Sequence, residues 1–253
     1  MLTETRNPAA DLVIFPTCWD DAIPRAQREI YEQVVSESHA RGLQFALGGA
    51  FAAAAYLGRW QDTGGMDLFA VPEDRGEFVE VLTVCGLRDD FDHAPYDRRW
   101  IYRGRSDGVV VDLTWAIANG RATVDREWLG AGPQIEFCGP TVRIVPPEEL
   151  IWSKLYVLQR DRCEWPDVLN LINAAGPRLD WQHLLKRMGE DAPLLYGALS
   201  IFRWLCPERA RQLPQWLWAG MARSLRNEET GPGHAELLDA RPWLVGPVSG
   251  IAA

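Results

Sequence analysis

This sequence of 253 residues lacks the features that mark membrane proteins, secreted proteins and zinc-binding proteins. No apolar run approaches the roughly 20 residues that a membrane-spanning helix requires. The N-terminus has no basic segment followed by an apolar one, which is the pattern of a secretory signal. The five cysteines include no close pair, so reduced thiols are expected and a zinc site is not. These absences favour a cytoplasmic protein without a membrane partner.

Positive charge is also scarce. Lys and Arg number 26 against 35 Asp and Glu, which gives a formal net charge of -9. Extended nucleic-acid binding needs a basic face, so we do not expect it. The net charge does not exclude a local basic patch, because four arginines cluster at Arg98, Arg99, Arg103 and Arg105. The alternative is that these side chains are the solvated surface of a hairpin.

The first 146 residues alternate between helical and strand patterns. Apolar periodicity predicts helices over 26–40, 50–57 and 72–82, and strands over 44–47 and 66–71. Beyond Gly86, two hairpins are predicted, one joining 100–103 to 109–115 through the polar stretch 104–108, the other joining 135–137 to 142–145. Residues 1–23 are expected to form an irregular arm.

From Pro146 onward the pattern is helical. Helices are predicted over 148–159, 165–174, 180–188, 193–205 and 207–226, and the tail from Asn227 is expected to pack loosely. The fold class is therefore α+β, a mixed sheet flanked by helices and followed by an all-helical C-terminal part. We place the domain boundary at residue 146, giving an α/β domain over 1–146 and a helical domain over 147–253.

Three features carry candidate chemistry. Gly48-Gly49 lies between a strand and a helix, where backbone N–H groups can hold an anion, although a tight turn needing small residues explains the pair equally well. Asp67 and Asp112 each interrupt an apolar strand. On neighbouring strands they would repel by about 4 kcal/mol at 4 Å, which a divalent cation relieves. The alternative is that each caps a turn or pairs with an arginine such as Arg59 or Arg103.

Lys154 lies on the helix that follows the Pro146-Pro147 pair. It flanks the apolar face of that helix, from which a lysine could reach a triphosphate as a point charge. A solvated helix lysine is the alternative.

Together these residues resemble a family. The segments Leu47-Gly-Gly-Ala50, Met66-Asp-Leu-Phe69 and Val111-Asp-Leu113, with Arg59, Thr63 and the stretch from Pro147 to Lys154, resemble the minimal nucleotidyltransferases of the DNA polymerase β superfamily. The closest likeness is to the bacterial branch of abortive-infection toxins and related uncharacterised proteins. It covers roughly residues 25–175.

The resemblance implies a site for a nucleoside triphosphate and Mg²⁺ or Mn²⁺. Asp67 and Asp112 would hold metal, Asp112 would also be the base for the attacking hydroxyl, and Lys154 would steady the triphosphate. The residues that would bind the nucleotide are Gly48, Gly49, Arg59, Thr63 and Lys154. The acceptor would be a hydroxyl of an RNA end, a protein side chain or a small molecule.

Gly65 departs from the family pattern, which has an Asp at this position. That Asp bridges two metal ions in the family, so its loss removes a ligand from each. Because each 1.4 kcal/mol lost at the transition state slows a reaction about tenfold, activity could fall by several decades. Asp62 is a possible replacement ligand. We therefore carry two alternatives, a catalytically degenerate nucleotide-binding or regulatory module, and a helical interaction protein whose Trp-rich C-terminal half binds a partner.

Overall fold

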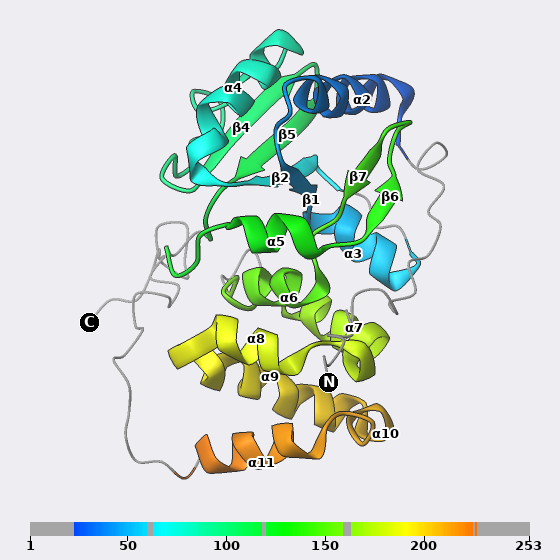
Figure 1. The fold of residues 1–253 in the computed structure, drawn as a ribbon, viewed down its shortest axis with the longest axis vertical. Coiled ribbons are helices and arrows are strands. Elements are labelled where there is room, and N and C mark those ends of the chain that lie inside the picture. The colour runs from blue at the N-terminus through cyan, green and yellow to red at the C-terminus, as the bar shows by residue number, and fades with distance from the viewer. Residues whose placement is uncertain (1–22, 60–62, 118–119, 159–162, 225, 227–253) are drawn as a thin grey trace, which may run out of the picture.

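A five-stranded mixed sheet organises the first half of the chain (Figure 1). The computed structural model describes residues 23–59, 63–117, 120–158, 163–224 and 226. In spatial order the strands are β1 (Phe45–Leu47), β2 (Met66–Ala70), β5 (Val109–Thr114), β4 (Ile101–Ser106) and β3 (Arg88–Asp89). β2 and β5 run parallel, and the other neighbouring pairs are antiparallel.

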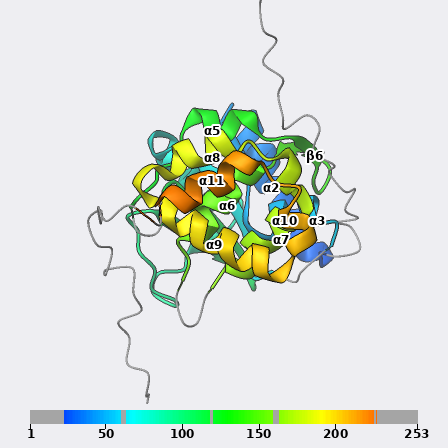
Figure 2. The same ribbon diagram turned by 90° about the horizontal axis from the view of Figure 1, so that it is seen from below.

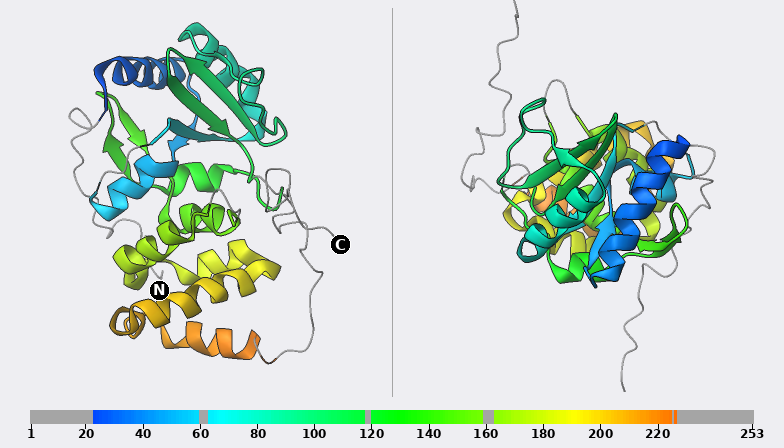
Figure 3. Two further views of the ribbon diagram at one scale, coloured as in Figure 1. Left: turned by 180° about the vertical axis from the view of Figure 1, so that it is seen from behind. Right: turned by 90° about the horizontal axis from the view of Figure 1, so that it is seen from above.

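Helices cover both faces of this sheet. The helices of the first half are α2 (Arg25–Ala40), α3 (Gly49–Leu57), α4 (Arg75–Val84) and α5 (Arg126–Ala131), with a 3₁₀ turn, η2, at Pro72–Asp74. α2 and α4 lie on the side of the sheet that faces away from the C-terminal helices (Figures 1 and 3). A small hairpin, β6 (Gln134–Glu136) and β7 (Thr141–Arg143), stands beside the sheet.

Helices make up the C-terminal part within its described residues, apart from their connections and one isolated β-bridge between Leu158 and Cys163. Its helices are α6 (Pro147–Leu155), α7 (Trp165–Ala175), α8 (Trp181–Met188), α9 (Ala192–Leu205), α10 (Pro207–Ala210) and α11 (Gln215–Ser224), with 3₁₀ turns η3 (Gly176–Arg178) and η4 (Gly189–Asp191). They stack progressively further from the sheet, and α11 lies at the far end (Figures 1 and 2). The predicted α+β class, with a helical C-terminal part, is confirmed.

Element boundaries differ from the expectation in several places. α5 was not predicted; it begins after Asp125, whose side chain accepts a hydrogen bond from Trp128 N at 2.8 Å. α6 ends at Leu155, four residues early. The last predicted helix is divided into α10, which ends at Ala210 in i→i−3 turns, and α11, which begins after Pro214.

The turn between β4 and β5 is also tighter than expected. β4 continues to Ser106, and only Asp107 and Gly108 connect it to β5. Both residues have positive φ, 45° and 84°, which suits the two-residue turn that Asp-Gly favours. This turn fixes the pairing of the two strands, which matters for the site below.

One continuous set of buried side chains runs through both halves of the chain. The proposed division into two domains at residue 146 stays a prediction, and the arm over 1–22, the tail from residue 227, and Asp62 lie outside the described residues. The cysteines described, Cys85, Cys138, Cys163 and Cys206, form no disulfide with one another. No described helix has both the length and the apolar character to cross a bilayer.

Candidate functional site

A cavity opens between one face of the sheet and α6. Sheet residues and loop residues from the first half form one wall, and α6 with the loop after it forms the other. The lining residues are Gly49, Asp67, Phe69, Trp100, Ile101, Asp112, Thr114, Ala116, Ile117, Leu150, Ser153, Lys154, Tyr156, Val157 and Glu164. Four of the residues singled out in the sequence therefore meet here, from four separate segments.

Asp67 and Asp112 are neighbours across the parallel strands β2 and β5, where they are paired directly in register. Because side chains alternate along a strand, Asp67 shares its face with Phe69, and Asp112 shares its face with Thr114. All four line the cavity. The apolar residues between them, such as Leu68 and Leu113, are fully buried. The two carboxylates thus project toward the same space.

Asp112 is already engaged by an arginine. Arg103, directly opposite it on β4, donates from Nε to Oδ1 at 2.7 Å and from a terminal nitrogen to Oδ2 at 2.6 Å. The side chains are 29% and 13% exposed. The hydrogen bonds to Asp112 raise the pKa of Arg103, with a smaller contribution from the charge of Asp67. The pairing alternative that the sequence left open for Asp112 is therefore realised.

The Gly48-Gly49 pair lets the start of α3 approach β2 closely. Gly48 N donates to Asp67 O at 2.8 Å, and a Cβ at Gly48 would overlap the ring of Phe69. Gly49 has a φ of +52°, and a Cβ there would overlap the Asp67 carboxylate. The positive end of the α3 dipole thus lies beside the Asp67 carboxylate, which it stabilises. Close packing accounts for both glycines.

Lys154 is buried, at 5% exposure, so the solvated-lysine alternative is wrong. Its Nζ donates to Glu164 at 2.7 Å and to Asp167 at 2.8 Å. Burial alone would lower the pKa of Lys154, but the two carboxylates outweigh that effect and raise it. Lys154 therefore links α6 to the start of α7 through two ion pairs at the edge of the cavity. The sequence analysis missed both partners, although acidic residues at the beginning of a helix are a visible signal.

The remaining predicted nucleotide-binding residues lie away from the cavity wall. Arg59 is exposed. Thr63 donates from its hydroxyl to Gly65 O at 3.1 Å, closing a local turn before β2. Neither is among the lining residues that the structure describes.

The donor set fits one divalent cation and not two. Mg²⁺ is commonly held by one or two carboxylates together with substrate phosphates, and Asp67 and Asp112 supply two adjacent carboxylates. Within the described part of the chain, however, no group of three or more His, Cys, Asp or Glu side chains could hold a metal ion. With Gly65 in place of a bridging carboxylate, a two-ion centre does not fit these residues.

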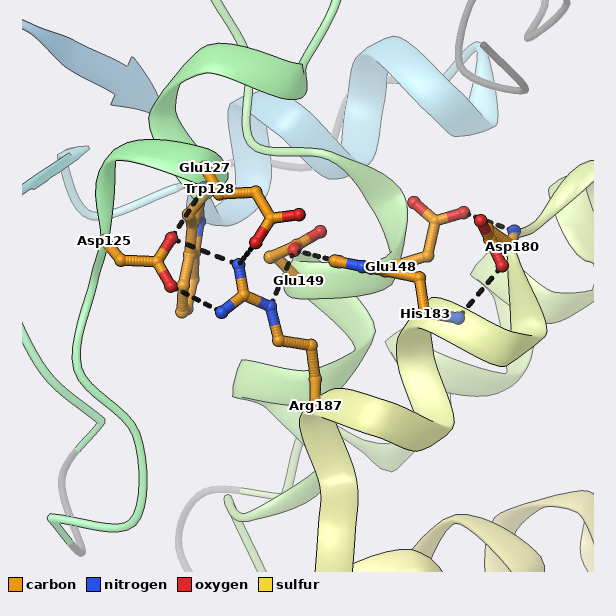
Figure 4. Close-up of polar contacts among 8 residues, drawn as sticks. All are labelled: Asp125, Glu127, Trp128, Glu148, Glu149, Asp180, His183 and Arg187. Carbon is orange, nitrogen blue, oxygen red and sulfur yellow. Dashed lines mark hydrogen bonds and ion pairs between the residues drawn. The ribbon is translucent and has the colours of Figure 1, made fainter. Parts of the chain in front are cut away.

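A buried polar network holds the first turn of α6 in place (Figure 4). Glu149, 2% exposed on its side chain, accepts from His183 Nε2 at 2.6 Å and from Arg187 Nε at 3.3 Å. Arg187 also reaches Asp125, before α5. Glu148 accepts from Asp180 N at 2.7 Å. Because α6 forms one wall of the cavity, this network fixes that wall to α5 and α8.

Glu148 gives the network a pH dependence. Burial raises its pKa to about 7 from 4.5. The folded protein keeps this proton while the unfolded chain releases it, so the contribution of Glu148 to stability falls as pH rises from about 4.5 to 7. We expect Glu148→Gln to raise the free energy of unfolding by about 2 kcal/mol at pH 8, because the shift is worth about 3 kcal/mol and an extra buried N–H costs about 1.

Urea denaturation at pH 5 and pH 8 measures this effect, with Glu190→Gln on the exposed 3₁₀ turn η4 as the matched control. The increase in the free energy of unfolding of Glu148→Gln should be small at pH 5 and about 2 kcal/mol at pH 8. Glu190→Gln should show no such increase at either pH. A loss of stability at pH 8 relative to the unmodified chain would contradict the argument.

Comparisons with known proteins come from structure only. Neither a protein-family model nor a curated protein matches the sequence. The chain is similar to the antibiotic-resistance factor ANT(2'')-Ia in solution, with 19% identity over 70% of this chain and 97% of that one, at a TM-score of 0.49. It is also similar to the lincosamide antibiotic adenylyltransferase LnuA bound to lincomycin (10% identity, 56% of this chain, 94% of that one, TM-score 0.41). A third similar structure is an antigenic nucleotidyltransferase-like protein from Paracoccidioides brasiliensis (15% identity, 75% of this chain, 93% of that one, TM-score 0.39). At these identities and TM-scores, none of the three assigns an activity to this chain.

Proposed function

We propose that the chain binds a nucleoside triphosphate with one divalent cation, Mg²⁺ or Mn²⁺, in the cavity between the sheet and α6. The observation that carries this proposal is the direct pairing of Asp67 with Asp112 in a cavity that Gly49 and Lys154 also line. These positions follow one another in the order in which the resemblance to minimal nucleotidyltransferases requires them.

Each element of the cavity has a part in this proposal. Asp67 and Asp112 face the cation, and the chemistry that such a cation supplies is neutralisation of phosphate charge at the reacting phosphorus. Trp100, Phe69 and Ile117 offer apolar surface to the uncharged part of the ligand. The Lys154 ammonium holds α6 in position through its hydrogen bonds to Glu164 and Asp167.

If the chain transfers a nucleotidyl group, an acceptor hydroxyl attacks the α-phosphorus and pyrophosphate leaves. The hydroxyl proton then passes to a carboxylate, for which Asp112 is the candidate. Both Asp112 oxygens accept from Arg103, so an acceptor hydroxyl would reach the carboxylate at the lone pairs that the guanidinium leaves open. The acceptor stays open among an RNA end, a protein side chain and a small molecule.

A second candidate is a binding or regulatory module without turnover. It is favoured by Gly65, where a Cβ would lie 2.6 Å from Val110 O, so strand packing leaves no room for the aspartate that a two-ion mechanism uses. The Arg103–Asp112 pair also favours a module without turnover, because the candidate base is hydrogen-bonded to an arginine. Binding of nucleotide without transfer is the outcome that this candidate predicts.

Calorimetric titration with ATP, CTP, GTP and UTP, each with and without Mg²⁺, tests binding. We expect Asp67→Asn to weaken Mg²⁺-dependent binding at least about tenfold, a loss of roughly 1.4 kcal/mol or more, because one of the two carboxylates loses its charge. Asp107→Asn, in the exposed β4–β5 turn, is the matched control and should bind like the unmodified chain.

Absent binding in the unmodified chain, or equal binding by Asp67→Asn, would discard the nucleotide site. A parallel assay with α-labelled triphosphates separates the two candidates. Label appearing in RNA, protein or a small acceptor identifies a transferase, and binding without transfer identifies the degenerate module.

A further inference from the structure

We propose that Arg103 is an internal counter-ion, which occupies Asp112 in the ligand-free protein and must be displaced before a divalent cation binds. This inference rests on the proposed function and concerns how the same site is controlled. Its consequence is that the cavity binds the cation poorly on its own and binds it well together with a triphosphate.

The first support is the geometry of the pair. Arg103 and Asp112 face each other across the antiparallel strands β4 and β5, and the guanidinium takes both carboxylate oxygens, at 2.7 and 2.6 Å. A two-point contact of this kind matches the planar fork of arginine and is among the strongest charged hydrogen bonds. While the pair is closed, each Asp112 oxygen accepts a hydrogen bond from the guanidinium, so an incoming cation has to approach the carboxylate beside a fixed positive charge.

The second support is the local charge. Asp67 and Asp112 are adjacent across the parallel pair, and like charges so close together repel each other strongly. Arg103, which is hydrogen-bonded to Asp112, offsets this repulsion with its own positive charge. A divalent cation bound by Asp67 and Asp112 would offset the same repulsion. The two positive groups therefore exclude each other electrostatically.

The third support is that the phosphate oxygens of a triphosphate can replace Asp112 as the hydrogen-bond partner of Arg103. Guanidinium groups pair with phosphate oxygens in the same two-point geometry that they use with carboxylates. Arg103 is 29% exposed, against 13% for Asp112, so its side chain has the freer access to solvent. Nucleotide binding can therefore supply a new partner for Arg103 while it frees Asp112, which couples the two ligands.

A neighbouring ion pair provides a matched comparison. Arg105, two residues further along β4, shares a face with Arg103 and pairs with Asp90 at 2.7 Å. This second pair lies outside the lining of the cavity. Removing the Arg105 charge therefore perturbs the same strand and breaks no hydrogen bond to Asp112, with which Arg105 has only a weaker long-range charge interaction.

The test is Mn²⁺ binding to the full chain, followed by electron paramagnetic resonance of the free ion, without nucleotide. We expect Arg103→Gln to bind Mn²⁺ about tenfold more tightly than the unmodified chain, a coupling of ordinary size. Arg105→Gln should leave the affinity unchanged. Arg103→Lys keeps the charge but loses the two-point contact, so it should fall between Gln and the unmodified chain and serves if the Gln variant does not fold.

A second titration adds ATP at a fixed concentration. Mn²⁺ affinity should rise clearly in the unmodified chain and less in Arg103→Gln, which has already lost the competitor. Equal Mn²⁺ affinity in the unmodified chain and in a folded Arg103 variant would overturn the inference, even if nucleotide binds. Tighter Mn²⁺ binding by Arg103→Gln with no binding of any triphosphate would instead uphold the counter-ion and reject the nucleotide site.

Discussion

Replacing Lys154 by Met is expected to lower the free energy of unfolding by about 3 kcal/mol at pH 7.5, because it removes the buried ammonium that donates hydrogen bonds to both Glu164 and Asp167. Met has a similar length and fills the same space, so the loss isolates the charge. The carboxylate side chains are 16% and 24% exposed. Partial access to water keeps the effect at the lower end of the range for a broken buried pair.

Urea denaturation checks the value, and Lys186→Met on α8 is the control, because Lys186 is exposed. The deficit of Lys154→Met should shrink at pH 4.5, since protonating either carboxyl group weakens its ion pair with the ammonium of the unmodified chain. A loss below about 1 kcal/mol would mean that the pair is worth no more than a surface salt bridge. Lys154 would then be available to a ligand, as the sequence analysis supposed.

Lys154 also shows where prediction from the sequence ends. Its place beside the apolar face of a helix was correct, but helical periodicity describes only one helix at a time. Burial of its ammonium depends on Glu164 and Asp167, which belong to the next helix and the loop before it. Tertiary contact between α6 and α7 decides the role of the side chain, and no local pattern encodes it.

The aspartates were easier to predict, because an acidic residue inside an apolar strand is costly unless something compensates it. That argument brought Asp67 and Asp112 to one site, and the parallel pairing of β2 and β5 places them side by side. Arg103 was one of the two arginines that the sequence offered as a partner, and the length of the β4–β5 turn decides that it pairs with Asp112. A two-residue Asp107-Gly108 turn sets Arg103 opposite Asp112, whereas the five-residue turn that we predicted would have set it opposite Val109.

The sequence offers two explanations for the glycine pair, anion binding and close packing, and the structure shows that close packing is sufficient. A Cβ at either position would overlap β2, so the glycines are needed for the approach of α3 whether or not an anion binds there. The same physical argument applies at Gly65. There the sequence showed only a missing ligand, while the structure shows a backbone position with no room for a side chain.

Replacing Gly65 by Ala is therefore expected to lower the free energy of unfolding by about 2 kcal/mol, the usual cost of forcing a methyl group into a packed site. A Cβ at residue 65 would lie 2.6 Å from Val110 O and 2.9 Å from Val110 Cβ, both closer than ordinary contact. Gly65→Asp should cost more, about 3 kcal/mol or above, since it adds a charge near Asp67. Thermal and urea denaturation measure both variants.

Gly64→Ala is the matched control, because a Cβ at residue 64 would meet nothing within 4 Å. It should leave stability nearly unchanged. If Gly65→Asp instead folded with the stability of the unmodified chain and gained nucleotidyl transfer, the strand ends would have to open easily, and the chain would be a transferase that lacks one ligand. Loss of stability without gain of transfer would show that β5 has closed over the position, so that turnover by two metal ions cannot be restored by a single substitution.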